Sequence, residues 1–140
     1  MYKPNTEEFA LFKNGEWRND PELKKNMETK YLDLRGADLY KADLYRADLY
    51  RADLTWACLA EANLCRANLY RAILYRANLC RANLYRASLY GANLTNAIID
   101  KNNFDKYIDK SIWEYENVCD DIVRIKRKGL LMRLLNKLKF

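Results

Sequence analysis

The feature that most constrains this chain is a repeat of five residues, clearest in the stretch ADLYKADLYRADLYRADL from Ala37 to Leu54. Alanine recurs at every fifth position from Ala37 to Ala97, and an aliphatic residue stands two positions after each alanine. Five residues turn a helix by about 500°, so successive leucines would spread around its whole circumference. A flat strand fails as well, because an odd period sends successive leucines to opposite faces.

The five-residue period is satisfied when the chain bends once in every repeat. Alanine and leucine then point inward, the residue between them points outward, and the last two residues form the corner. Repeated bends close a coil, and stacked coils pair their backbones about 4.8 Å apart. The pattern therefore predicts an all-β solenoid.

The repeat units also match a known family. The units ADLYR, ANLYR and ANLCR closely resemble the A-(D/N)-L-x-x unit of pentapeptide-repeat proteins, over residues 32–106. This resemblance implies a right-handed quadrilateral β-helix with four repeats per coil and just under four coils. We expect an N-terminal capping segment at residues 1–31, the β-helix at 32–106, and a C-terminal helical cap or dimerisation segment at 107–140.

A coil of four repeats stacks residues that are 20 apart, which predicts ladders on the outside of the rod. Tyrosine and arginine fill several of these ladders, and both are enriched where proteins bind partners. Packing of tyrosine on arginine stems, with no partner, is the alternative. The candidate partner-binding residues are Tyr45, Arg46, Tyr50, Arg51, Trp56, Arg66, Tyr70, Arg71, Tyr85, Arg86 and Tyr90.

Two features of the outer surface have more than one interpretation. Trp56 occupies an outward corner, either as a binding anchor or beneath the N-terminal segment. The outward residues of the first coil are Asp38, Asp43, Asp48 and Asp53, whereas asparagine dominates later coils. Stacked aspartates repel one another, whereas stacked asparagines share hydrogen bonds. This difference favours a structural explanation for the confinement of the aspartates to one coil, over an acidic rim that binds a partner.

Both open ends of a solenoid need caps. The apolar residues available at the N-terminus are Phe9, Leu11, Phe12, Trp17 and Leu23. Asn14-Gly15 is compatible with a hairpin turn or a helix stop. At the other end, Ser111 followed by Glu114 matches a capping box and predicts a helix that packs on the last coil.

The last eleven residues have a helical amphipathic pattern. On a helical wheel Leu130, Leu131, Leu134, Leu135 and Leu138 occupy an arc of about 140°. Three roles fit this segment: a cap that folds back, a dimerisation helix, or a helix on an anionic membrane. Several pentapeptide-repeat proteins pair through C-terminal helices, so the resemblance implies a homodimer through these leucines.

Composition argues against catalysis. The chain has no histidine, its four cysteines lack metal-site spacing, and its four glycines form no phosphate-binding loop. We therefore predict no enzyme, no metal and no cofactor. The net charge of +6 favours anionic partners. Without a signal-peptide pattern or an apolar run near 18 residues, we expect a cytoplasmic protein with no transmembrane segment.

These observations predict a non-catalytic scaffold that binds another macromolecule, and a protein is the favoured class of partner. The resemblance offers one alternative, because some pentapeptide-repeat proteins mimic DNA and protect type II topoisomerases such as DNA gyrase. Those proteins are acidic and longer, whereas this chain is basic and short. Nucleic-acid binding through the arginine ladders is another alternative, which Asp43 and Asp48 weaken.

Overall fold

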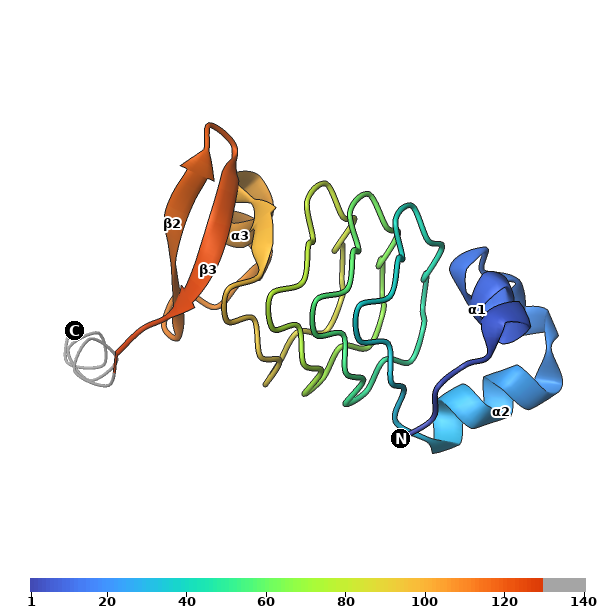
Figure 1. The fold of residues 1–140 in the computed structure, drawn as a ribbon. Coiled ribbons are helices and arrows are strands. Elements are labelled where there is room, and N and C mark those ends of the chain that lie inside the picture. Colours follow the sequence, from blue (N-terminus) through green and yellow to red (C-terminus); the bar gives the residue numbers. More distant parts are fainter. Residues whose placement is uncertain (130–140) are drawn as a thin grey trace.

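The computed structural model describes residues 1–129, and a stack of coils forms their centre (Figure 1). Parallel bridges join residues 20 apart, so that Asp43 pairs with Asn63 and Asn63 with Asn83. The N–H of Asn63 donates to the Ala42 carbonyl, and the Leu44 N–H donates to the Asn63 carbonyl, both at 2.9 Å. Each coil therefore contains four repeats, as the columns of 20 predict. Only one residue per repeat is bridged, so the coils contain no long strands.

The interior of the stack is built from the repeated alanines and leucines. Every repeat leucine from Leu39 to Leu84 is at most 1% exposed. The alanines are the smaller partners that let the chain turn inward at each corner. Leu89, near the end of the stack, is the exception and remains half-buried.

Each corner is a four-residue turn from one leucine to the next alanine. The Ala42 N–H donates to the Leu39 carbonyl at 3.0 Å, and the residue before Ala42, Lys41, has a φ of +55°. Positive φ at the third residue is the geometry of a type II turn, which usually favours glycine. Here most corners use arginine instead, and each corner arginine holds this left-handed conformation.

The aspartates and asparagines between alanine and leucine stabilise these corners. Asp43 Oδ1 accepts the Tyr45 N–H at 3.2 Å, and Asn68 Oδ1 accepts the Tyr70 N–H at 3.1 Å. This local turn satisfies a backbone donor that has no partner in the next coil. Either residue type can accept this hydrogen bond, so the aspartates of the first coil and the asparagines of the later coils serve the same local role.

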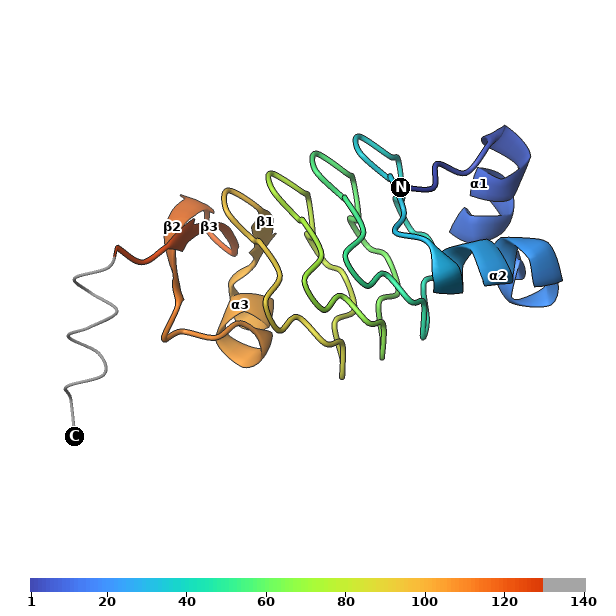
Figure 2. The same ribbon diagram turned by 90° about the horizontal axis from the view of Figure 1, so that it is seen from below.

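The N-terminal cap contains three short helices: α1 (Thr6–Lys13), η1 (Glu16–Asn19) and α2 (Pro21–Thr29). They lie at one end of the stack, as Figure 2 shows. Asn14-Gly15 is a helix stop, because Gly15 follows α1 with a φ of +79°. Phe12, Trp17, Leu23 and Met27 of this segment join the hydrophobic core. Tyr2 forms a single parallel bridge with Leu32, beside the first coil.

The C-terminal end of the stack is closed by β1 (Ile98–Asp100), α3 (Lys101–Tyr107), β2 (Trp113–Cys119) and β3 (Ile122–Arg127). The three strands form an antiparallel sheet in the order β1-β3-β2. Strand β3 pairs with β1, the last strand of the stack, through pairs such as Ile99 with Val123. The hairpin thus satisfies an edge that would otherwise remain open (Figure 1).

Two sequence-based expectations for this end were wrong. The helix expected from Ser111 does not form, because Trp113 and Tyr115 alternate with Glu114 and Glu116 on a strand, with Trp113 facing the core. An alternation with a period of two is the pattern of a strand, and this segment pairs with β3 along its length. Strand pairing therefore prevails over the helix that the capping-box pattern predicted. The repeat register was also expected to reach residue 106, but Phe104 lies buried in α3.

The leucines from Leu130 to Leu138 that we expected to dimerise lie outside the described residues. Within residues 1–129, no helix has both the length and the apolar character needed to cross a bilayer.

Candidate partner-binding face

One side of the rod carries most of the predicted partner-binding residues, and we call it the arginine face. Its outward residues are Asp48, Asn68 and Ser88, which stack in one column. One flanking corner carries Arg46, Arg66 and Arg86, and the other carries Arg51 and Arg71. Five tyrosines of these corners complete the face. Tyr45, Tyr50, Tyr70 and Tyr85 each precede one of the arginines, and Tyr90 precedes Gly91.

The tyrosine ladder at one corner is a continuous stack of rings. The ring centroids of Tyr50 and Tyr70 lie 5.7 Å apart with an interplanar angle of 16°, and those of Tyr70 and Tyr90 lie 5.6 Å apart at 13°. The predicted ladder is therefore present. Tyr31 extends it with an edge-on contact to Tyr50 at 5.8 Å. Sequence analysis missed Tyr31, although it stands 20 residues before Arg51 and so belongs to the same corner.

Most arginines of the face lie over tyrosine rings. The guanidinium carbon of Arg71 is 5.2 Å from the Tyr70 centroid, and that of Arg86 is 5.2 Å from the Tyr85 centroid. Arg51 lies over both Tyr50 and Tyr31, and it donates a hydrogen bond to the Tyr31 hydroxyl at 2.9 Å, which raises the pKa of Arg51. These contacts hold the guanidinium groups in fixed positions.

The face arginines differ from the other charged corners in their ion pairing. Among the side chains that the structure describes, none of the five face arginines forms a salt bridge. The corner of Lys41, Glu61 and Arg81, which precedes the Arg46 corner in the coil, differs, because Glu61 lies 3.6 Å from the Lys41 ammonium and 3.9 Å from the Arg81 guanidinium. Positive charge therefore accumulates on the arginine face and is partly balanced on that neighbouring corner.

The one acid of the face, Asp48, is already engaged. Its Oδ1 accepts the Tyr50 N–H at 3.1 Å and the Asn68 amide at 2.9 Å. This carboxylate belongs to the turn that shapes the corner. The face therefore presents guanidinium groups and phenol rings to a partner, with a single, hydrogen-bonded carboxylate between them.

Trp56 lies apart from the arginine face, on the next corner. Its side chain is 58% exposed, and the Arg76 guanidinium covers the ring at 4.6 Å from the centroid. A cavity of about 600 Å³ beside it is lined by Glu116, Arg124 and Lys126 of the C-terminal hairpin. This exposure is against the interpretation in which the N-terminal segment covers Trp56, and its role as a binding anchor stays a prediction.

Burial raises the pKa of the Cys80 thiol, which disfavours a reactive thiolate there. In the described part of the chain, no three histidine, cysteine, aspartate or glutamate side chains are grouped to hold a metal ion.

The repeat region matches a known protein family. A family model described as pentapeptide repeats, eight copies, matches residues 32–64, 47–84 and 62–100. Residues 32–100 belong to the pentapeptide-repeat family. Pentapeptide-repeat proteins are typically non-catalytic structural or binding proteins. No individually curated protein matches this chain.

Two solved pentapeptide-repeat structures are similar to the repeat segment. One is HetL from the cyanobacterium Nostoc, a protein involved in the regulation of heterocyst differentiation; it is 37% identical, with a TM-score of 0.28. The other comes from the thylakoid lumen of Arabidopsis thaliana and is 36% identical, with a TM-score of 0.29. Each match covers 49% of this chain, and respectively 39% and 51% of the solved chain.

Proposed function

We propose that this pentapeptide-repeat protein is a non-catalytic scaffold, built on a right-handed quadrilateral β-helix, that binds a protein with an acidic surface. The observation that carries the proposal is the set of five arginines on one face, none of which forms a salt bridge with a side chain that the structure describes. Stacked guanidinium groups one coil apart, about 4.8 Å, repel one another and weaken the folded state. The coil itself has no need for arginine at these corners, since Gly36, Trp56 and Glu61 occupy equivalent ones.

A bound acidic surface would remove this repulsion. Arginine pairs with carboxylates through two parallel hydrogen bonds, which gives both affinity and orientation. The tyrosines limit the motion of the arginine side chains, so less conformational entropy is lost on binding. Arg66 and Tyr70 lie near the middle of the face, where interface hot spots concentrate.

Two other partner classes make different predictions. Nucleic acid would use the same arginines, but its affinity would fall steeply with added salt because bound counterions are released. A DNA-mimic protein that protects a topoisomerase would present an acidic face, and the arginine face has the opposite charge. An acidic protein is therefore the partner that the arginine face favours over nucleic acid and over a topoisomerase.

The deciding experiment is affinity capture from the native cell with three single variants. Arg66→Ala and Tyr70→Ala should lose the partner, while Arg81→Ala should retain it. Arg81 is the matched control, because it occupies an equivalent corner at a φ of +58°, against +59° for Arg66, but is paired with Glu61. Circular dichroism should show the same fold for all three.

Several results would contradict the proposal. Retention of every partner by Arg66→Ala and Tyr70→Ala would assign the arginine face a purely stabilising role. Retention of DNA or RNA at low salt, lost steeply as salt rises, would favour nucleic acid. A dose-dependent change in DNA supercoiling by gyrase would support the topoisomerase alternative.

A further inference from the structure

One corner of the arginine face ends in a residue without a side chain. The corner of Arg51 and Arg71 continues with Gly91, which also has a left-handed backbone, with a φ of +72°. Arg51 lies over the ring of the tyrosine before it at 5.3 Å, and Arg71 does the same at 5.2 Å. Because Gly91 follows Tyr90, no cation among the described side chains lies over the Tyr90 ring.

Tyr90 is accordingly the exposed end of the tyrosine ladder. It is 77% exposed, and its ring stacks on Tyr70 on one side. The next position of the column, Lys110, lies in the loop between α3 and β2, where the coil has ended. Among the described residues, no aromatic ring covers the other side of Tyr90. The ladder therefore has an open stacking position at this end.

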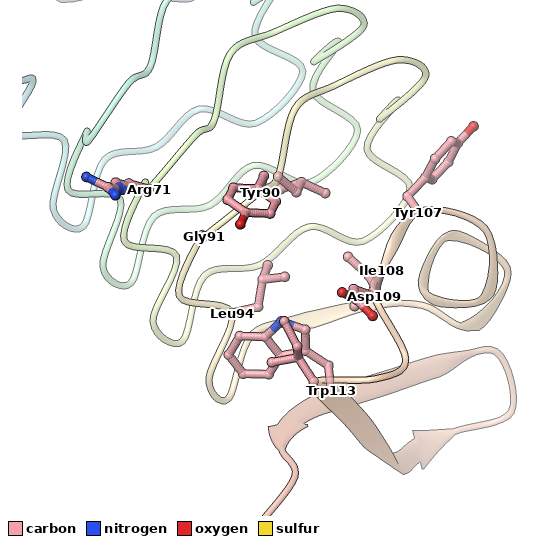
Figure 3. A pocket seen from close by; sticks show the side chains of 10 residues that line it. Arg71, Tyr90, Gly91, Leu94, Tyr107, Ile108, Asp109 and Trp113 are labelled. Carbon is pink, nitrogen blue, oxygen red and sulfur yellow. The ribbon is translucent and has the colours of Figure 1, made fainter. Parts of the chain in front are cut away.

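An apolar groove lies beside this open position. Tyr90 and Gly91 line a cavity of about 470 Å³, and its apolar lining comes from Leu89, Leu94, Ile108, Ile112 and Trp113. Figure 3 shows the side chains of Leu94, Ile108 and Trp113 directed toward a common space. The groove exists because the last coil is incomplete, so that Leu89 remains half-buried while the earlier leucines are enclosed.

The charged residues that line the groove are Arg71 and Asp109. Arg71 belongs to the arginine face and forms no salt bridge with a described side chain. Asp109 is engaged within the chain, because its Oδ1 accepts the Ser111 N–H at 2.8 Å, and hydrogen bonds from Ser111 lower the pKa of its carboxyl. Figure 3 shows Arg71 and Asp109 on different sides of the groove. A carboxylate that approaches over the arginine face therefore meets the Arg71 guanidinium first.

We propose that the acidic partner inserts one aromatic side chain into this groove, where the ring stacks on Tyr90 and an adjacent carboxylate of the partner pairs with Arg71. The inference rests on the proposed function, because it specifies which part of an acidic partner fits this end of the face. An aromatic ring suits the site better than an aliphatic chain, since it continues the stacking that Tyr70 and Tyr90 keep at 5.6 Å. An aromatic anchor in a pocket beside a charge pair is also the usual composition of an interface hot spot.

The test measures the binding of three capped pentapeptides to the full-length chain by NMR titration. The peptide EDFDE has a central phenylalanine, and EDLDE and EDADE are its matched aliphatic controls. We expect EDFDE to bind at least tenfold more tightly than EDADE and at least threefold more tightly than EDLDE. Nuclear Overhauser contacts between the phenylalanine ring and Tyr90 should place the peptide in the groove.

Gly91→Arg is the decisive variant. It gives this corner the residue that stands at Arg51 and Arg71, in a backbone conformation that arginine already adopts there. The nearest neighbour of the new Cβ is the flexible Arg71 side chain, with Cγ at 3.2 Å. A site that depended on charge alone would bind EDFDE more tightly in this variant, because a cation is added. We expect instead that the advantage of EDFDE over EDADE falls below twofold, as it should in Tyr90→Ala.

Gly36→Arg is the matched control for the added charge. Gly36 occupies another left-handed corner, with a φ of +65°, and a Cβ there meets nothing within 4 Å. This variant should keep the full advantage of EDFDE. Circular dichroism should show the same fold for all the variants.

The outcomes separate this inference from the proposed function. Equal binding of EDFDE and EDADE would overturn the inference alone, and equal binding of EDFDE and EDLDE would overturn the aromatic anchor. Failure of all three peptides to bind would contradict both the inference and the acidic partner. Self-association of the chain that Gly91→Arg abolishes, measured by sedimentation velocity, would assign the groove to a second copy and would also overturn the inference.

Discussion

The side-chain amide of Asn68 donates a hydrogen bond to Oδ1 of Asp48, one coil away, at 2.9 Å. The equivalent amide of Asn63 donates to Asp43 at 3.1 Å. An amide below a carboxylate is therefore the pairing that joins the first coil to the second on two sides of the rod. Replacement of the amide by a second carboxylate would turn this attraction into repulsion.

We predict that Asn68→Asp lowers the free energy of unfolding by about 1 kcal/mol at neutral pH, because a donor is lost and two carboxylates face each other. The new carboxylate can still accept the Tyr70 N–H, so the corner should persist. Protonation of either carboxylate removes the repulsion, so the loss of stability in the variant should shrink as the pH falls toward about 4. Urea unfolding at several pH values measures this.

Asn93→Asp is the matched control for this prediction. Asn93 also accepts a backbone N–H two residues on, but its neighbour in the column is Ile73. An equal loss of stability in both variants would refute the role of the stacked carboxylates.

The two glycines at Gly15 and Gly36 should respond differently to alanine. Both have positive φ, but a Cβ on Gly15 would lie 2.5 Å from Arg18 Nη1 and 2.7 Å from Asp43 Oδ2, whereas one on Gly36 meets nothing within 4 Å. Gly36→Ala should cost about 1 kcal/mol for the left-handed conformation alone. Gly15→Ala should cost about 2 kcal/mol or more, since the ion pair between Arg18 and Asp43 must also move. Thermal unfolding of both variants decides this, and equal costs would show that the cap tolerates the displacement.

The arginine face should contribute nothing to stability by itself. Arg66→Gln removes one charge from a stack of three and should leave Tm unchanged or raise it by a few degrees, most at low salt, where repulsion is least screened. Arg81→Gln removes a partner of Glu61 and should leave Tm unchanged or lower it slightly. Scanning calorimetry at two ionic strengths compares them. A clear loss of Tm in Arg66→Gln would mean that the face stabilises the fold.

The carboxyl of Asp33 should titrate well below its ordinary range. Two hydrogen bonds from the Arg35 guanidinium, at 2.8 and 2.7 Å, lower the pKa of Asp33 to about 2. Because the folded-state pKa is depressed, the associated stability is present above about pH 4 and is lost as the pH falls toward 2. Arg35→Gln should raise the pKa of Asp33 back toward its usual value, because the guanidinium hydrogen bonds are the largest cause of the depression. Carboxyl carbon NMR titration measures both values, and an unchanged pKa in the variant would contradict this account.

The repeat region was predictable because its pattern has one solution. Alanine and leucine at a five-residue interval can both be buried only in a coil of regular bends, and the coil length then fixes which tyrosines and arginines stack. The pairing of Glu61 with Lys41 and Arg81 follows from the same columns, although we did not anticipate it.

The ends were less predictable because they depend on tertiary contacts. Strand β3 forms against β1, so its structure reflects an available sheet edge as much as local sequence. Ser111 and Glu114 match a capping box and predicted a helix, but the segment that follows pairs with β3 as a strand instead. The exposure of Trp56 likewise depends on where the N-terminal helices pack, which the repeat pattern does not encode.

The caps are attached to a stack in which four repeats complete one coil, so every repeat advances the chain by one quarter of a coil. Insertion of a single five-residue unit would therefore rotate the C-terminal hairpin by about a quarter turn relative to the N-terminal helices. Insertion of four units would restore the original orientation and only move the ends apart by about 4.8 Å. The relative orientation of the two ends is thus set in discrete steps, and the length of the rod can change without altering that orientation only in multiples of 20 residues.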